Sequence, residues 1–170
     1  MNAVFVDTNV FVYARDASER YKQPLAAQRI ARLWREQTGR TSMQVLNEYY
    51  VTLTRKLKPG LQPDTAWDEV ELLLAWEPQI VDRELLLKAR EVERRFRLSW
   101  WDSMVVSAAQ LQECETLLTE DLQDGMIFGS VTVRNPFTTG IAEDPAVYKI
   151  LPSVSPRHRA RGRPRRIAPG

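Results

Sequence analysis

The spacing of apolar residues changes along the chain and predicts strands that alternate with helices. Residues 3–6 form a short run rich in apolar and β-branched residues, which is typical of a buried parallel strand. Further strands are expected at residues 79–81, 115–119 and 131–134. Between the strands, apolar residues recur every three or four positions, in helices expected to begin near Val10, Pro24, Ser42, Pro63, Arg83 and Ser99. This order predicts an α/β fold around a mainly parallel sheet.

The pattern ends near residue 137 and divides the chain into three parts. We expect one folded domain over residues 1–137, followed by a weakly patterned extension over residues 138–151. Residues 152–170 are rich in proline and arginine, and we expect them to be disordered in isolation because they offer little apolar surface to bury.

Charge is distributed unevenly between the body of the chain and this tail. Residues 152–170 hold six arginines and no acidic residue, so residues 1–151 hold 18 basic and 22 acidic residues, a net charge of −4. The body is therefore not a general nucleic-acid-binding surface by charge. The tail could attract RNA through counterion release, or it could simply be a solubilising extension.

Composition indicates a globular protein. Hydrophobic residues make up 44% of the chain and charged residues 27%. No run approaches the roughly 18 consecutive apolar residues that a membrane helix requires. The first nine residues lack the basic start and cleavage site of a signal peptide, and Cys114 is the only cysteine, which excludes a disulfide framework. We therefore expect a cytoplasmic protein without a membrane partner.

The single histidine, His158, lies in the arginine-rich tail. The domain therefore has no histidine for a Ser-His-Asp or Cys-His catalytic group, and it lacks the ligands of a histidine–cysteine zinc site. Any catalysis by the domain must use carboxylates, hydroxyls and amines.

Two aspartates directly follow predicted strands. Asp7 comes after the first strand, and Asp121 lies just beyond the strand at residues 115–119. In open α/β sheets, ligands bind beyond the carboxyl ends of the strands, where two carboxylates can chelate a hard cation. Asp7 also fits the N-cap of the helix that follows, so its position supports both interpretations.

Two further acids have structural interpretations. Asp102 is the fourth residue of Ser99-Trp100-Trp101-Asp102, which fits a capping box, although its place beside the apolar stripe also suits a partly buried carboxylate. Glu48 lies nearly opposite Leu46 and Tyr50 on a helical wheel, which predicts an exposed glutamate. The same default interpretation applies to Glu120, Asp124 and Glu143.

Five segments of the chain together resemble one protein family. They are Val4-Phe5-Val6-Asp7-Thr8-Asn9, Ser42-Met43-Gln44-Val45-Leu46-Asn47-Glu48, Leu98-Ser99-Trp100-Trp101-Asp102-Ser103, Leu117-Leu118-Thr119-Glu120-Asp121 and Val133-Arg134-Asn135-Pro136-Phe137. In order, spacing and local context, these segments are similar to PIN-domain proteins, in particular VapC-type toxin ribonucleases of type II toxin–antitoxin systems. The resemblance covers about residues 1–137. Each motif is weak alone, but four in register make a strong case.

The resemblance implies a fold and a metal site. The fold would be a PIN-like three-layer α/β/α sandwich with a mainly parallel sheet of about five strands. Asp7, Glu48, Asp102 and Asp121 would converge around Mg²⁺ or Mn²⁺, with Glu48 facing the site rather than solvent. Asn9, Ser42, Ser103 and Thr119 would orient the acids through hydrogen bonds, and Asp124 would be an additional acid near Asp121.

The resemblance also implies an activity and partners. Carboxylates gathered in one cleft repel each other, whereas a divalent ion relieves that repulsion, acidifies a water and neutralises charge on a scissile phosphate. The implied function is endoribonuclease activity in a homodimer that a cognate antitoxin silences. Several basic residues of the body are available to hold the RNA backbone, namely Arg15, Arg20, Lys22, Arg55, Lys56 and Lys58.

Three other functions fit parts of the pattern. A phosphatase of the haloacid dehalogenase class also places an aspartate after its first strand, but it requires a second acid where Asn9 stands. A non-catalytic PIN-like module would bind RNA or a partner without cleavage, although all four acids are present. A DNA nuclease would use the same cleft, so the choice of RNA rests on the resemblance.

Overall fold

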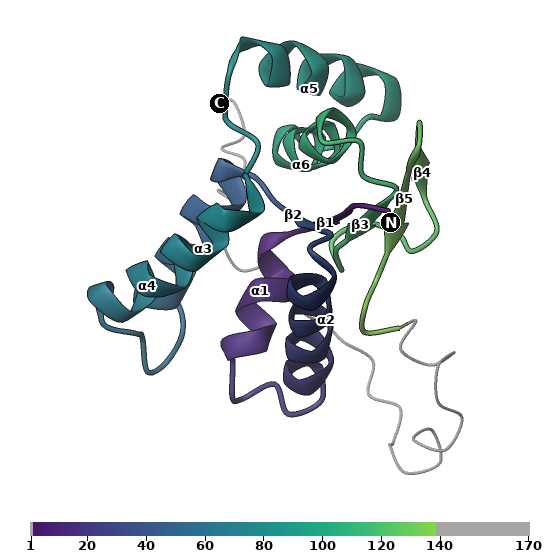
Figure 1. The fold of residues 1–170 in the computed structure, drawn as a ribbon. Helices are drawn as coiled ribbons and strands as arrows, with labels where there is room; N and C mark the ends of the chain where they lie inside the picture. Colours follow the sequence, from purple (N-terminus) through teal and green to yellow (C-terminus); the bar gives the residue numbers. More distant parts are fainter. Residues whose placement is uncertain (1, 139–170) are drawn as a thin grey trace, which may run out of the picture.

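A five-stranded sheet with helices on both faces organises residues 2–138, which are the residues that the computed structural model describes (Figure 1). The strands are β1 (Val4–Val6), β2 (Gly39–Arg40), β3 (Thr116–Leu118), β4 (Ile127–Phe128) and β5 (Val131–Arg134), in the spatial order β2-β1-β3-β5-β4. Every neighbouring pair is parallel except β4 and β5. The predicted three-layer fold with a mainly parallel sheet is confirmed. The structure describes no residue after residue 138, so the predicted extension, apart from its first residue, and the predicted tail lie outside the described residues.

The helices form two layers and a hairpin. They are α1 (Thr8–Arg15), α2 (Lys22–Glu36), α3 (Met43–Arg55), α4 (Pro63–Leu73), α5 (Arg83–Phe96) and α6 (Trp100–Leu111), with a 3₁₀ turn, Leu74–Trp76, after α4. Helix α6 packs against β3 and β5 with α5 outside it, while α1 and α2 pack together on the other side of the sheet (Figure 1). Helices α3 and α4 form a hairpin whose α3 contacts α1.

Alternation along the strands separates the two faces of the sheet. Phe5, Leu117 and Val133 are fully buried, whereas their neighbours Leu118 and Arg134 point to the side of α2. Because successive side chains of a strand point to opposite faces, the fully buried residues face the side of α6. One part of the core therefore lies between the sheet and α6, and buried residues of α1 and α3, such as Phe11 and Leu53, form another part.

The helices begin where the capping residues predict. Asp82 accepts a hydrogen bond of 2.9 Å from the backbone N of Leu85, and Ser42 accepts one of 3.3 Å from that of Val45. Helix α2 differs, because it begins at Lys22, two residues before the proline expected to open it. None of the helices in residues 2–138 is long and apolar enough to cross a membrane.

The short strands depart from the prediction. The expected strand at residues 79–81 is reduced to a single parallel bridge between Ser42 and Gln79. Strands β2 and β4 were not expected, since each has only two residues and so shows no periodicity. These strands exist because β1 and β5 supply backbone partners beside them, which local sequence does not reveal.

Candidate active site

Asp7 and Asp121 meet at the carboxyl ends of β1 and β3, as their positions after these strands predict. The two strands are parallel neighbours, so the residues that follow them emerge at the same edge of the sheet. Asn9, in the first turn of α1, joins the two acids because its Nδ2 donates to Asp7 Oδ2 at 3.3 Å and to Asp121 Oδ2 at 3.2 Å. The amide hydrogens thus place partial positive charge between two carboxylates.

Thr119 is the centre of this hydrogen-bond network. Its fully buried hydroxyl donates to Asp7 Oδ2 at 2.8 Å. The same oxygen accepts from Asn9 Nδ2 at 2.9 Å and from the backbone N of Asp121 at 3.1 Å. A hydroxyl has one donor and two acceptor positions, so all of its hydrogen-bonding capacity is used. The side chains of Asp7 and Asn9 and the backbone of Asp121 are therefore fixed relative to one another.

Asp7 carries negative charge in an unfavourable environment. Burial is the main reason that the pKa of Asp7 rises from 3.8 to about 7, and the charges of Asp121 and Glu48 raise it further. Hydrogen bonds from Thr119 and from the backbone N of Thr8, the latter at 2.7 Å, oppose this rise. Asp7 is therefore the N-cap of α1, as one sequence interpretation predicted, and it also lies close to other acids that raise its pKa.

Glu48 is half-buried and faces α1, so the helical wheel was wrong to place it in solvent. Its Oε1 accepts from Gln44 Nε2 at 2.9 Å, and its Oε2 accepts from Thr8 Oγ1 at 3.4 Å. Helix α3 is buried over a wide arc that includes Gln44 beside the apolar residues, because α1 covers this side of the helix. Glu48 thereby lies at the edge of that arc and next to the residue after Asp7.

Asp102 is held by the first turn of α6. Ser99 is the N-cap of that helix and accepts from the backbone N of Asp102 at 3.1 Å, while Ser99 Oγ donates to Asp102 Oδ2 at 2.5 Å. Ser103 Oγ donates to the backbone O of Ser99 at 2.8 Å, which fixes the same turn. Ser99 is therefore the N-cap, as expected, and the Asp102 carboxylate bonds to the Ser99 hydroxyl and is buried, at 8% exposure.

A family comparison decides the fold family. The model of the PIN domain family matches residues 4–123, which include Asp7, Glu48, Asp102 and Asp121. The chain belongs to the PIN domain family. A solved structure of the toxin VapC20 from Mycobacterium tuberculosis, described as cleaving the sarcin-ricin loop, is 21% identical, with a TM-score of 0.49 over 68% of this chain and 87% of that chain. Comparison with curated proteins found no match.

The donors of this PIN domain fit a hard divalent cation. All the candidate ligands are carboxylate oxygens, and burial, followed by the charges of Asp121 and Glu48, raises the pKa of Asp7. Within residues 2–138, no three His, Cys, Asp or Glu side chains lie close enough together to form a complete metal site. Magnesium commonly uses only one or two carboxylates together with waters and substrate phosphates, so the chemistry of the linked pair Asp7 and Asp121 is compatible with this ion.

Two expected orienting residues of this PIN domain, Ser42 and Ser103, and the expected additional acid Asp124 bond to backbone groups, as the Ser103 hydroxyl does to the backbone O of Ser99. The hydroxyl of Ser42 caps α3, and Oδ1 of Asp124 accepts from the backbone N of Asn135 at 2.8 Å. Asp124 therefore fastens the loop after β3 to the end of β5. The expected arrangement around Asn9 and Thr119 is present, whereas the contacts of Ser42 and Asp124 are with backbone rather than with an acid.

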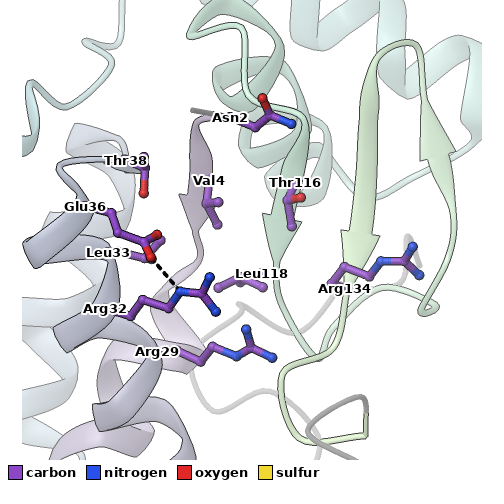
Figure 2. A pocket seen from close by; sticks show the side chains of 10 residues that line it. All are labelled: Asn2, Val4, Arg29, Arg32, Leu33, Glu36, Thr38, Thr116, Leu118 and Arg134. Atoms are coloured by element: carbon purple, nitrogen blue, oxygen red, sulfur yellow. Dashed lines mark hydrogen bonds and ion pairs between the residues drawn. The ribbon is translucent and has the colours of Figure 1, made fainter. Parts of the chain in front are cut away.

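One cavity within residues 2–138 of the PIN domain lies apart from the acids. It has a volume of about 550 Å³ and lies between α2 and the sheet. Figure 2 shows Arg29 and Arg32 reaching from α2 toward Leu118 on β3, with Arg32 paired to Glu36 at 2.8 Å. None of the four acids lines this cavity, so the candidate active site is the surface at the strand ends rather than this pocket.

Sequence reasoning missed four residues around the site. Gln44 and Thr8 hold Glu48, and the position of Gln44 four residues before Glu48 on one helix was an available signal. Lys22 and Glu120 form a buried ion pair beside Asp121. Nothing in the sequence pattern joins these two residues, because they are 98 positions apart.

Proposed function

We propose that this PIN domain is a metal-dependent endoribonuclease whose acids Asp7, Glu48, Asp102 and Asp121 hold Mg²⁺ or Mn²⁺ and catalyse phosphodiester hydrolysis. The observation that carries the proposal is the pair Asp7 and Asp121, joined through Asn9 and Thr119 at the carboxyl ends of adjacent parallel strands. The uncompensated charge on buried Asp7 supports a cation at this place.

The roles of the side chains follow from their positions. When bound, the divalent ion would supply positive charge for the scissile phosphate and acidify a water. Among the four proposed ligands, Asp7 and Asp121 form the linked pair, and the hydrogen bonds from Asn9 and Thr119 keep them in place. Glu48 is half-exposed beside Thr8, where it can accept a proton from the attacking water. By family resemblance, the products carry a 5′-phosphate and a 3′-hydroxyl.

The proposed partners are RNA, a second copy of the chain and an antitoxin. An exposed apolar group at the start of α5 supports the homodimer, because Ile80 is 58% exposed, Val81 50% and Leu87 63%. The antitoxin and the toxin role rest on the sequence resemblance to VapC-type proteins. We also propose that residues 1–137 form the catalytic domain, with the arginine-rich tail as an accessory segment.

RNA cleavage by the purified full-length chain tests this function. Structured and unstructured RNAs are incubated with Mn²⁺ or with chelator, and the new ends are sequenced. We expect 5′-phosphate ends that require the metal and disappear in the Asp7→Asn and Asp121→Asn variants. Asp68→Asn, which changes an exposed acid of α4, is the matched control and must cleave normally.

Alternative functions give different results in the same experiment. Intact RNA with wild-type protein, together with altered RNA binding in Asp7→Asn, identifies a non-catalytic binding module. Cleavage of single-stranded DNA in preference to RNA identifies a DNA nuclease. Covalent phosphorylation of Asp7 by a phosphate ester supports the phosphatase. The same sequencing in cells, comparing wild type with Asp102→Asn after brief induction, then identifies the RNA target.

A further inference from the structure

Lys22 lies in a nearly closed polar cluster next to the candidate site. It is 7% exposed, and its Nζ is 2.5 Å from Glu120 Oε2 and 3.1 Å from the hydroxyl of Tyr13. The Tyr13 hydroxyl also donates to the other oxygen of Glu120, so the three side chains form a closed triangle of hydrogen bonds. The ammonium lies 4.2 Å from the centre of the Tyr13 ring, a further favourable contact for a buried cation.

Phe137 closes the cluster from the end of the domain. Its ring lies 5.2 Å from Lys22 Nζ and meets the Tyr13 ring edge-on, with 5.1 Å between the ring centres. The hydroxyl of Tyr21 donates to the backbone O of Phe137 at 3.2 Å. The segments before α2 and after β5 thus converge on Lys22 and Tyr13, the two residues that bond to the Glu120 side chain.

Glu120 connects this cluster to the acids. It lies between Thr119 and Asp121 in the chain, and its backbone N donates to Asn9 Oδ1 at 3.4 Å. Its side chain is therefore anchored to Lys22 while its backbone is anchored to the residue that joins Asp7 and Asp121. A shift of the Glu120 side chain would move the backbone on which Asp121 sits.

The burial of Lys22 removes it from the group of residues available to hold RNA. Its charge is satisfied inside the domain, so the sequence-based interpretation that it could contact the RNA backbone does not fit its position. A buried ion pair adds little net stability compared with apolar residues of the same size. The free-energy cost of removing the two charges from water is better explained if the ion pair fixes one arrangement of the chain, which is the best-attested use of buried polar groups.

We propose that Lys22 and Glu120 are positioning residues that fix the segment 119–121, so that Asp121 faces Asp7 in the geometry needed for metal binding. This inference rests on the proposed nuclease site for its functional consequence. The structural part of the proposal, that the ion pair holds residues 119–121 in place, rests on the observed contacts alone.

The test uses the full-length chain with three variants and one control. Lys22→Met and Glu120→Gln each remove one charge at nearly constant size, and the double variant removes both, so that no unpaired charge remains buried. The control, Arg32→Met with Glu36→Gln, removes an Arg–Glu ion pair within α2 whose side chains are more exposed. Amide hydrogen exchange, Mn²⁺ binding by calorimetry, and kcat and KM for RNA cleavage are measured for each protein.

The proposal expects local effects in the variants and none in the control. Exchange of the amides of residues 119–122 becomes about tenfold faster, while that of β1 and β3 changes with global stability only. The Mn²⁺ dissociation constant rises about tenfold, as is typical when residues that orient metal ligands are lost. The value of kcat falls with little change in KM.

The opposite outcome overturns the proposal. If exchange at residues 119–122 and Mn²⁺ affinity match those of the control, the ion pair has no positioning role, whatever its effect on the free energy of unfolding. If Lys22→Met does not fold, the double variant decides in the same way. If the wild type binds no Mn²⁺, the proposed nuclease fails, and the exchange data alone decide whether the ion pair positions the segment.

Discussion

The hydroxyl of Thr119 donates a 2.8 Å hydrogen bond to the carboxylate of Asp7, joining residues 112 positions apart at the ends of two parallel strands. This bond favours the ionised carboxylate and lowers its pKa, against the stronger opposite effect of burial. Thr119 therefore keeps Asp7 closer to the charged form that a metal ion requires. It does so without being an acid itself.

We predict that Thr119→Val weakens metal binding while keeping the fold. Valine has nearly the same shape, so the change mainly removes the hydrogen bonds to Asp7, Asn9 and Asp121. Loss of such an orienting residue typically costs about 10–100-fold in metal affinity or activity. Calorimetric titration with Mn²⁺ and the rate of RNA cleavage measure the effect.

Thr41→Val is the matched control for this substitution. Thr41 is also a fully buried threonine, and its hydroxyl donates to the backbone O of Val6 at 3.2 Å rather than to an acid. Thr41→Val is expected to lose about 1 kcal/mol of stability for its one hydrogen bond, and Thr119→Val is expected to lose more because three hydrogen bonds are removed. Equal Mn²⁺ affinity in the two variants would show that Thr119 has no special role.

Glu48→Gln is predicted to reduce metal affinity and to lower the pKa of Asp7. Glutamine can keep the contact with Thr8, but it removes a negative charge whose presence raises that pKa. The Asp7 pKa is followed by nuclear magnetic resonance of its labelled carboxyl carbon in chelator. Glu71→Gln, on the exposed surface of α4, should leave both quantities unchanged. An unchanged Mn²⁺ affinity in Glu48→Gln would remove Glu48 from the ligand set.

The acids differ in how far the sequence could predict their surroundings. Asp7 and Asp121 follow strands whose apolar, β-branched-rich composition is visible in the sequence, so their meeting at one sheet edge was predictable. The contacts of Glu48 were not, because a helical wheel assumes one buried stripe, whereas α3 is covered both by α4 and by α1. Only the family register pointed Glu48 to the site.

The ion pair of Lys22 and Glu120 shows a second limit of sequence reasoning. Each residue alone has the pattern of a solvated charge, and charged residues are rarely buried unless they are paired. The pairing depends on how α2 packs relative to the end of β3, which is a tertiary relationship. Short strands such as β2 could not be predicted from the sequence for the same reason, because pairing with a neighbouring strand and not their own residues defines them.

We predict that Gly39→Ala destabilises the domain through the ring of Trp76. A Cβ at Gly39 would lie 2.6 Å from two carbon atoms of that ring, which is packed between Phe11 and Trp34. Overpacking of this kind typically costs about 1–3 kcal/mol, measured as the free energy of unfolding in denaturant. Trp76→Phe leaves a smaller ring, so the double variant should lose less stability than the two single losses combined. Purely additive losses would contradict the proposed clash.

The raised pKa of Asp7 predicts how stability depends on pH in the absence of metal. The folded state binds the Asp7 proton up to a pKa of about 7, whereas the unfolded chain releases it near 3.8. Between these values the unfolded state holds fewer protons, so the free energy of unfolding falls as pH rises. The contribution of Asp7 to the free energy of unfolding is fully present below about pH 4 and is lost above about pH 7.

Asp7→Asn is therefore predicted to remove this loss, and the stability gained over wild type should grow as pH rises from 4 to 8. Asparagine caps helices about as well as aspartate, so α1 keeps its N-cap. A shift of about three pKa units corresponds to a difference on the order of 4 kcal/mol at pH 8. Denaturant unfolding in chelator across this range measures it, with Asp82→Asn, at the N-cap of α5, as the control. Parallel stability curves for wild type and Asp7→Asn would show that the burial of Asp7 does not raise its pKa.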